Sequence, residues 1–180
     1  MNSYAQLYDA EQMKQGVREL ARQIGRHFSV SGRGFALVGI PQMGVPLARL
    51  LCEELSANGV SPDFGQLDIT MYRDDIGTRN MLPMIHETVI PFDVNDRDII
   101  LVDDVLSSGR TIRAALDALT DFGRPGMIRL AVLVDRGEPE FPIRADYVGF
   151  KVSLPLERKV KVRFEDAADV KAGIYDIKWQ

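Results

Sequence analysis

Hydrophobic residues recur along this chain with two different periods. Between residues 9 and 28 they return every three to four positions, which predicts an amphipathic helix. The same period predicts helices at 45–56 and 112–122. Uninterrupted apolar runs are typical of buried strands instead. We expect such strands at 35–40, 64–71, 99–102 and 129–134, and shorter ones at 146–150, 159–164 and 174–179.

Alternating strands and helices predict an α/β fold. The expected architecture is a Rossmann-like, mainly parallel sheet flanked by helices on both faces. Ligands of such sheets bind beyond the carboxyl ends of the strands. Polar segments follow three of the predicted strands, at 41–44, 103–111 and 135–137. We therefore expect these segments to line one crevice.

The composition narrows the class of protein. A chain of 180 residues fits one domain, or one core with a small accessory lobe. The net charge of −4 gives no general attraction to nucleic acid, so RNA binding would need a local basic patch. The single cysteine, Cys52, excludes an internal disulfide and Cys-rich metal sites. The polar N-terminal segment and the lack of an apolar stretch of about 18 residues predict a cytoplasmic protein without a membrane partner.

The most informative stretch is 99–113, IILVDDVLSSGRTIR. Its apolar run ends in adjacent carboxylates, Asp103 and Asp104, which would point to opposite faces within a strand. We expect the strand to end there, because only then can both acids reach one ligand. Buried carboxylates need partners, and ribose hydroxyls or a hydrated Mg²⁺ held by phosphates would supply them. The alternative is a pair of solvated acids at a strand end.

A polar turn follows the acids and precedes a predicted helix. Ser107, Ser108 and Thr111 offer hydroxyls, Arg110 offers a guanidinium, and Gly109 permits close approach to the backbone. A helix N-terminus favours an anion through its free N–H groups and its dipole. A simple helix cap from either serine is the alternative, and both interpretations can hold together. Acids beside an anion-binding turn indicate a sugar phosphate as the ligand.

The same stretch also carries a family resemblance. Residues 99–111 resemble the signature that binds phosphoribosyl pyrophosphate (PRPP) in type I phosphoribosyltransferases. Further runs resemble the bifunctional family that combines pyrimidine operon attenuation with uracil phosphoribosyltransferase activity, the PyrR family. These runs are LDITMYRDD (67–75), IPFDV (90–94), VDDVLSSGRTIRAALDAL (102–119), GRP (123–125) and LAVLVDRGEPEFPIRADYVG (130–149). The last run is more specific than the signature, which many transferases share.

The resemblance implies a fold, a reaction and partners. The fold would be that of type I phosphoribosyltransferases, a single domain over 1–180 with its core at about 30–150. A small hood would come from the C-terminal segment and the N-terminal helix. Uracil and PRPP would react to UMP and pyrophosphate, with Mg²⁺ carried by the substrate near the two acids. The resemblance further implies a homo-oligomer, either dimer or tetramer, and pyrimidine-operon leader RNA as a partner.

The resemblance also assigns roles to individual residues. The catalytic residues would be Asp103, Asp104 and Arg73, the last on a long loop, 73–87, that could close over the site. The phosphate of PRPP would lie against Val105, Leu106, Ser107, Ser108, Gly109, Arg110 and Thr111. Pyrophosphate would meet the loop Pro41, Gln42, Met43 and Gly44, and the base would meet Val134, Asp135, Arg136 and Gly137. Without the resemblance, Arg73 and its neighbours are typical of a solvated turn.

The 41–44 loop departs from the family pattern. Gln42 and Met43 stand where relatives usually have threonine and arginine, and Pro41 removes a backbone donor. Losing a charge-assisted hydrogen bond costs about 1.5–3 kcal/mol. We therefore expect weak donor binding or slow turnover. Two alternatives stay open: a catalytically weak or inactive regulator that senses nucleotides, and a phosphoribosyltransferase for another base.

Basic residues gather at two places where RNA could bind. Arg18, Arg22 and Arg26 are spaced four apart and would form a stripe on the first predicted helix, which a two-fold axis would double. A second cluster consists of Arg158, Lys159, Lys161 and Arg163. Specific RNA recognition favours aromatic stacking platforms, and none is evident beside these residues. An ordinary solvated charged face is the alternative at both places.

Overall fold

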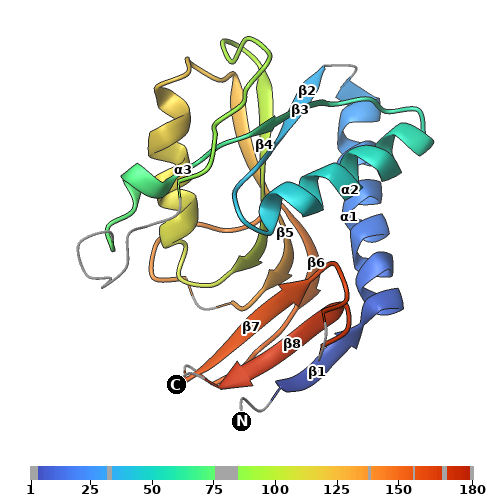
Figure 1. The fold of residues 1–180 in the computed structure, drawn as a ribbon. Coiled ribbons are helices and arrows are strands. Elements are labelled where there is room, and N and C mark those ends of the chain that lie inside the picture. The colour runs from blue at the N-terminus through green and yellow to red at the C-terminus, as the bar shows by residue number, and fades with distance from the viewer. Residues whose placement is uncertain are drawn as a thin grey trace.

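Parallel strands form the central sheet of the molecule (Figure 1). The computed structural model describes residues 4–31, 34–75, 85–137, 139–155, 157–167 and 170–178. The strands are β2 (Phe35–Gly39), β3 (Asp63–Gln66), β4 (Asp98–Leu106), β5 (Met127–Asp135) and β6 (Tyr147–Lys151). They lie in the order β3-β2-β4-β5-β6, and each neighbouring pair is parallel. Their carboxyl ends therefore share one edge, which confirms the predicted fold class.

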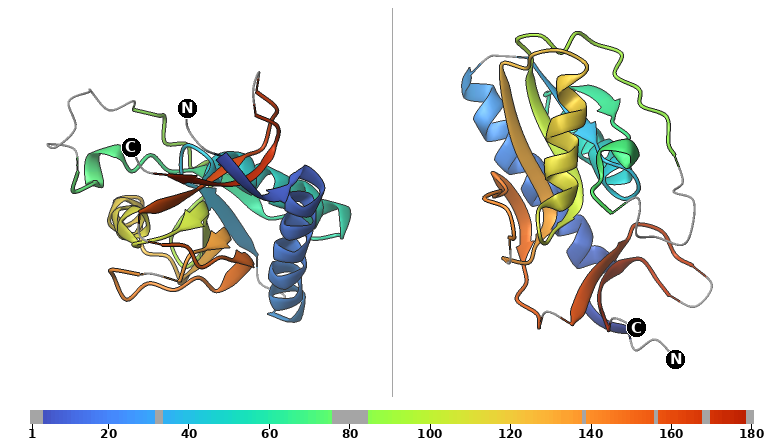
Figure 2. Two further views of the ribbon diagram at one scale, coloured as in Figure 1. Left: turned by 90° about the horizontal axis from the view of Figure 1, so that it is seen from below. Right: turned by 90° about the vertical axis from the view of Figure 1, so that its left-hand side faces the viewer.

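Helices cover both faces of this sheet. α1 (Ala10–Ser31) and α2 (Gly44–Ala57) lie on one face and α3 (Arg110–Thr120) lies on the other (Figures 1 and 2). Leu20 of α1 and Leu51 of α2 are fully buried in one apolar cluster, and Leu119 of α3 in another. Burying each such side chain contributes about 1.5–3 kcal/mol. This layering explains why the central strands are continuous apolar runs. None of the described helices combines the length and the hydrophobicity needed to cross a membrane.

A smaller antiparallel sheet lies beside the carboxyl edge of the central sheet. It contains β1 (Tyr4–Asp9), β8 (Gly173–Lys178) and β7 (Arg158–Arg163), in that order, and forms the expected hood. Figures 1 and 2 show it next to both marked chain ends. Tyr8 of β1 stacks on Phe150 of β6 with ring centroids 4.1 Å apart, and Val162 and Ile174 are buried in the same cluster as α1. Apolar packing therefore joins the hood to the central sheet.

Some element boundaries differ from the predictions. The N-terminal part of the hood is strand β1, whereas α1 packs against α2 and β6 on the central sheet. The strand predicted at 64–71 ends at Gln66, and Thr70–Tyr72 forms a short 3₁₀ helix, η1. β4 continues to Leu106, because Leu106 still pairs with Asp135 of β5. The expectation that this strand ends at its two acids is therefore wrong.

A first prediction concerns Gly44, where α2 begins directly against β4. A Cβ at this position would lie 2.3 Å from the carbonyl oxygen of Val102. We expect Gly44→Ala to lower the free energy of unfolding by about 2 kcal/mol or more, because the start of α2 has to move away from the sheet. Gly25→Ala is the matched control, since its Cβ would meet only Leu55, at 3.6 Å, and alanine favours a helix interior. Urea unfolding measures both variants, and equal stability would contradict the prediction.

Candidate active site

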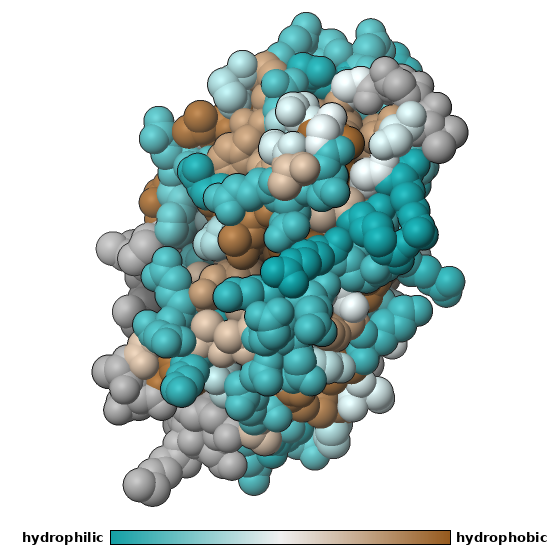
Figure 3. Space-filling view, turned by 90° about the vertical axis from the view of Figure 1, so that its right-hand side faces the viewer, coloured by the Kyte–Doolittle hydropathy of each residue, from teal (hydrophilic) through white to brown (hydrophobic). Residues whose placement is uncertain are grey.

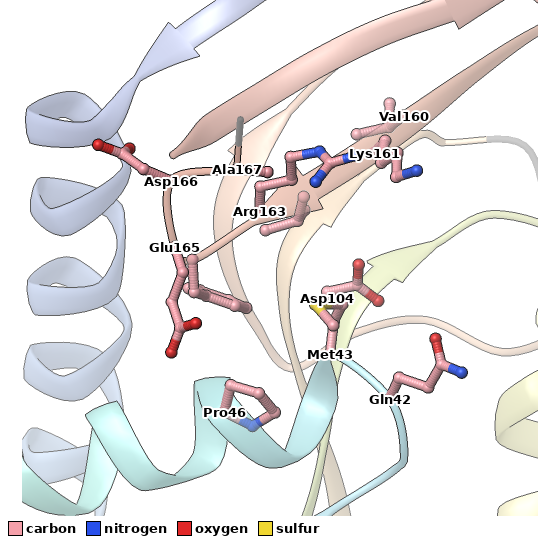
Figure 4. Close-up of a pocket in the computed structure, with 12 residues that line it drawn as sticks. Gln42, Met43, Pro46, Asp104, Val160, Lys161, Arg163, Glu165, Asp166 and Ala167 are labelled. Atoms are coloured by element: carbon pink, nitrogen blue, oxygen red, sulfur yellow. The ribbon is translucent and has the colours of Figure 1, made fainter. Parts of the chain in front are cut away.

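Two adjacent carboxylates lie near the carboxyl end of β4. Asp103 is buried, with 6% of its surface exposed, and its Oδ1 accepts a hydrogen bond of 3.0 Å from the Asp104 backbone N–H. Asp104 is half-buried, and its carboxylate lines a cavity (Figure 4). The two carboxylates differ in exposure because consecutive side chains of a strand point to opposite faces. Asp104 is thus the member of this acidic pair that faces the cavity.

The surroundings of the acidic pair disfavour two full negative charges. Burial raises the pKa of Asp103 well above its usual value, the neighbouring Asp104 carboxylate adds to this, and Arg73 opposes it. Burial also raises the pKa of Asp104, against a hydrogen bond with Asp103 that lowers it. Such a pair favours retaining a proton unless a cation or hydroxyl donors reach it. The site is therefore suited to a ligand that brings those groups.

The predicted phosphate-binding segment, residues 105–111, is called the phosphate loop below and runs from the end of β4 into the first turn of α3. Gly109 is buried and has a φ of +88°, a conformation that side chains rarely adopt, so glycine is required at the turn. The Ser108 carbonyl accepts hydrogen bonds from the N–H groups of Glu140 and Phe141, at 2.9 and 3.2 Å. Gly109 precedes the helix without a side chain, and the Ser108 hydroxyl accepts a hydrogen bond of 3.4 Å from the Arg110 N–H, the first N–H of α3. The N–H groups that follow in the first turn can still serve an anion.

Arg110 does not direct its guanidinium to the phosphate loop. Its Nη1 donates to Asp74 at 2.8 Å, and its Nη2 donates to Glu140 at 2.7 Å. Its guanidinium carbon also lies 5.3 Å from the centre of the Phe141 ring. The guanidinium thus stabilises the loop through contacts with neighbouring segments and is not directed at an anion bound by the loop. The loop's own capacity for an anion comes from its backbone N–H groups and from the hydroxyls of Ser107, Ser108 and Thr111.

The 41–44 loop lies directly beside the acidic pair. The Ile40 N–H donates to the Val102 carbonyl at 3.0 Å, and Gly44 packs against the same carbonyl. Between these anchors, the peptide bond from Pro41 to Gln42 is cis. Gln42 and Met43 line the cavity together with Asp104. The structure therefore brings two of the predicted segments into one site.

Arg73 lies at the start of the long loop, directly after η1. Its guanidinium makes two hydrogen bonds of 2.8 Å to the carboxylate of Asp75. It is also close enough to Asp103 to lower the pKa of that carboxyl. The predicted closing loop, 73–87, includes residues 76–84, which lie outside the described residues. Of this loop, the structure locates Arg73 near the acidic pair and the segment 85–87 beside Asp68.

Asp68 joins the two ends of the long loop. Its Oδ1 accepts hydrogen bonds from the N–H and hydroxyl of Thr70, at 2.8 and 2.5 Å, and its Oδ2 accepts one of 2.7 Å from the His86 N–H. Burial raises the pKa of Asp68, but these hydrogen bonds outweigh it and leave the pKa below its usual value. The sequence interpretation missed this residue. Its signal is an acid inside the otherwise apolar run LDITM.

The predicted base-binding segment, 134–137, lies beside the phosphate loop. Asp135 pairs with Leu106 in the sheet, and the Arg136 N–H donates to the Leu106 carbonyl at 2.9 Å. Val134 and Arg136 are buried, and Nη2 of Arg136 donates to the Pro155 carbonyl at 3.3 Å. Gly137 is exposed, with a φ of +70°, and its N–H donates to Asp135 Oδ1. The chain turns away from the sheet at this point.

A cavity of about 520 Å³ lies between the two sheets (Figure 4). One wall contains Gln42, Met43 and Asp104, and the other is formed by residues 160–167 of β7 and the segment after it. The sequence interpretation considered Lys161 and Arg163 only as part of a basic cluster for RNA. It could not place them at this cavity, because nothing in the local pattern indicates which residues β7 faces.

The acidic pair fits a magnesium ion that a ligand brings with it. Within the described ranges there is no group of three or more His, Cys, Asp or Glu residues able to hold a metal ion. Mg²⁺ in proteins commonly uses one or two carboxylates and completes its shell with substrate oxygens and water. Asp103 and Asp104 can supply these carboxylates, and a cation would relieve their mutual repulsion. The donor set therefore suits a metal shared with a phosphorylated ligand.

The arginine stripe of α1 lies in a groove against α2. A hollow of about 380 Å³ is lined by Arg18, Arg22 and Arg26 together with Glu54. Arg18 lies 3.7 Å from Glu54, and Arg22 forms an ion pair with Glu19. Figure 3 views the side of the molecule on which these helices lie, and hydrophilic residues cover much of it. Carboxylates thus reduce the positive charge of the stripe, and its role in RNA binding stays a prediction.

Comparison with known proteins identifies the family. Residues 3–167 match the family described as phosphoribosyl transferase domain. "Bifunctional protein PyrR" of Roseiflexus sp. (strain RS-1) is 45% identical over 174 residues, which are 96% of this chain and 94% of the relative. The protein of the same name from Deinococcus radiodurans is 45% identical over 163 residues, 90% of this chain and 88% of the relative. That of Thermus aquaticus is 46% identical over 167 residues, 92% of each chain.

Solved structures share the fold. Hypoxanthine phosphoribosyltransferase of Trypanosoma cruzi has a TM-score of 0.73 at 17% identity, with 97% of each chain covered. A hypoxanthine-guanine phosphoribosyltransferase of Bacillus anthracis has a TM-score of 0.72 at 20% identity, covering 96% of this chain and 97% of that one. The architecture is therefore that of a type I phosphoribosyltransferase. Within this class, the chain belongs to the PyrR family.

A second prediction concerns stability and pH. Because the folded state raises the pKa of Asp103, ionising this carboxyl destabilises the fold, and stability falls as pH rises above the unfolded value. We expect Asp103→Asn to raise the free energy of unfolding at pH 7, because asparagine has a similar shape and brings no charge into the interior. The gain shrinks toward pH 4. Thermal melts across this range, with the exposed Asp117→Asn as control, measure it. A destabilised Asp103→Asn at pH 7 would contradict the prediction.

Proposed function

We propose that the protein is a uracil phosphoribosyltransferase, which converts uracil and PRPP to UMP and pyrophosphate. One observation carries the proposal: the acidic pair of β4 lies between the phosphate loop and the 41–44 loop at one edge of the sheet. PRPP has the same order of groups, with a hydroxyl-bearing ribose between a 5′-phosphate and a pyrophosphate. The shared name of the relatives supports the activity.

We assign the 5′-phosphate to the phosphate loop. Backbone N–H groups at the start of α3, with the hydroxyls of Ser107, Ser108 and Thr111, would donate to its oxygens. Gly109 keeps the backbone accessible, and Arg110 holds the loop through Glu140. Binding at a helix N-terminus needs no lysine side chain, which fits the absence of a lysine from residues 105–111.

The acidic pair would bind the ribose hydroxyls and the magnesium ion that accompanies PRPP. Magnesium, when bound, supplies neutralising charge to the departing pyrophosphate. In the reaction, uracil N1 loses its proton and forms a bond to C1 of the ribose while the bond from C1 to the pyrophosphate oxygen breaks, and the departing pyrophosphate can take up that proton. The electron pair of the broken bond leaves with pyrophosphate, so the ribose gains positive charge. Asp104, whose carboxylate lines the cavity, would stabilise that charge electrostatically.

The remaining assigned residues would orient the base and exclude water. We assign the edge of uracil to the carbonyl groups of Arg136 and Gly137, because the Asp135 carbonyl and the Arg136 N–H already bond to Val152 and Leu106. Arg73 would close toward the acidic pair with its loop, whose ends Asp68 holds together. Keeping water out matters, since water attacking C1 would hydrolyse the donor.

A third prediction tests this activity directly. We expect the protein to form UMP from labelled uracil, PRPP and magnesium. Asp104→Asn should lower kcat at least about 100-fold, because it removes the charge that stabilises the ribose in the transition state. Asp117→Asn, on the exposed side of α3, should leave kcat unchanged. Product chromatography and steady-state rates provide the measurement.

Two outcomes would favour the alternatives instead. UMP binding by calorimetry without any UMP formation would replace the enzyme with a nucleotide sensor. Product from cytosine, hypoxanthine or orotate, but none from uracil, would reassign the base. Both outcomes would leave the fold and the phosphate loop as described.

We also propose a regulatory role, because the relatives carry the name bifunctional and α1 presents a groove with three arginines. The partner would be pyrimidine-operon leader RNA, bound by Arg18, Arg22 and Arg26 on an oligomer that doubles the groove.

A fourth prediction concerns this RNA binding. We expect the RNA affinity measured by gel shift to fall steeply as salt rises, since phosphate contacts release counterions. Arg22→Gln together with Arg26→Gln should weaken binding at least tenfold. No shift at low salt, with or without UMP, would exclude this role.

A further inference from the structure

The 41–44 loop provides no positive charge to the cavity that it lines. Its members are Pro41, Gln42, Met43 and Gly44, and the proline has no N–H to donate. Pyrophosphate remains anionic even with one magnesium ion bound. An uncompensated anion beside Asp104 would also be repelled by that carboxylate. If the proposed reaction takes place here, cations from another part of the chain have to face this loop.

Lys161 and Arg163, the hood cations, lie on the opposite wall of the same cavity. They occupy alternate positions of β7, opposite Tyr175 and Gly173 of β8, so they share one face of the hood. Both are half-buried, and both line the cavity with Met43 and Asp104. Figure 4 shows them on the strand that crosses above these residues. The two sheets thus place positive charge across from the uncharged loop.

The bonding of the hood cations differs from that of a structural arginine on the same strand. Arg158, at a position of opposite parity, is likewise half-buried, but it forms an ion pair of 2.6 Å with Asp176 of β8. Neither Lys161 nor Arg163 forms an ion pair with a carboxylate of the described residues. Arg163 Nε is buried and has no hydrogen-bond acceptor among them. A buried donor without a partner is unfavourable by about 1–3 kcal/mol, so an acceptor from a ligand would stabilise it.

Acidic residues also border the cavity, but on another side. Glu165 and Asp166 follow β7, and both are exposed to solvent. Asp166 accepts a hydrogen bond of 2.7 Å from the Ala172 N–H. Figure 4 shows both toward α1, whereas Lys161 lies toward Asp104 and Gln42. The positive charge is therefore concentrated on the side where the acidic pair and the 41–44 loop meet.

We propose that Lys161 and Arg163 bind the pyrophosphate group of the donor and of the product, in place of a cation on the 41–44 loop. The proposal rests on the proposed function for the identity of the anion. The sequence predicts weak binding of the donor, because Met43 stands where relatives usually have arginine. Under this proposal the affinity for the donor depends on the hood cations instead and need not be weak. The proposal also gives the hood a direct part in binding the leaving group.

The test measures binding of magnesium pyrophosphate to the full chain by calorimetry, without turnover. Lys161→Met and Arg163→Gln should each raise the Kd for pyrophosphate by about 10- to 100-fold, as expected for a lost hydrogen bond to a charged group. The Kd for UMP, which lacks pyrophosphate, should stay within about twofold. Lys178→Met, on neighbouring β8 and outside the cavity, is the matched control and should change neither value. Arg163→Lys, which keeps the charge, should retain most of the affinity.

A rescue variant separates ligand binding from a structural role. Met43→Arg, added to Lys161→Met, should restore pyrophosphate affinity at least fivefold, because it returns a cation to the same cavity from the other wall. Unchanged pyrophosphate affinity in both single variants, or an equal loss of UMP affinity, would overturn the proposal. So would a wild-type protein that binds no pyrophosphate. Failure to form UMP would refute the proposed reaction alone, since the pyrophosphate titration does not depend on turnover.

Discussion

The pairing of β4 with β2 and β5 is the constraint on which the site depends. β4 is hydrogen-bonded on both sides, and its pairing with β5 continues past the acidic pair as far as Leu106. This pairing holds Asp103 in the interior, where burial raises its pKa and disfavours its ionised form, and it turns Asp104 toward the cavity. The same strand anchors the 41–44 loop through the Val102 carbonyl and delivers the phosphate loop to α3. A shift of one residue in this register would exchange the two acids between interior and cavity.

The charges of the site are distributed over segments that are distant in the sequence. Negative charge comes from the centre of the sheet, and partial positive charge comes from the first turn of α3. Full positive charge comes from the hood. Arginines near the phosphate loop, such as Arg110 and Arg73, are held by neighbouring carboxylates instead. These ion pairs organise the loops. Lys161 and Arg163, which form no ion pair with a carboxylate among the described residues, are able to respond to an anionic ligand.

Much of the fold could be predicted from the sequence, because continuous apolar runs and helical periodicity report burial in a layered sheet. β2, β4, β5 and the three α-helices follow from that signal. β1 could not be predicted, since it has no apolar run and depends on pairing with β8 at the other end of the chain. The end of β4 was misplaced because two acids normally terminate a buried strand, whereas here β5 supplies the hydrogen bonds that continue it.

The candidate site could be predicted only in part. Its acidic pair, phosphate loop and 41–44 loop were found as local motifs. The positions of Lys161 and Arg163 depend on how the hood packs, and no local pattern encodes that.

The cavity has one wall from each sheet, and this has a thermodynamic consequence. A ligand that contacts both walls acts as a reversible cross-link between the hood and the central sheet. Its binding free energy then adds to the apolar packing of Tyr8, Phe150 and Val162 that already joins them. Local opening of the hood, which would otherwise be among the least costly fluctuations of the molecule, becomes rarer as ligand concentration rises. Those amide protons of β7 that donate to β8 would report this through slower exchange as ligand concentration rises. Occupancy of the site and rigidity of the terminal strands are thus two measures of the same equilibrium.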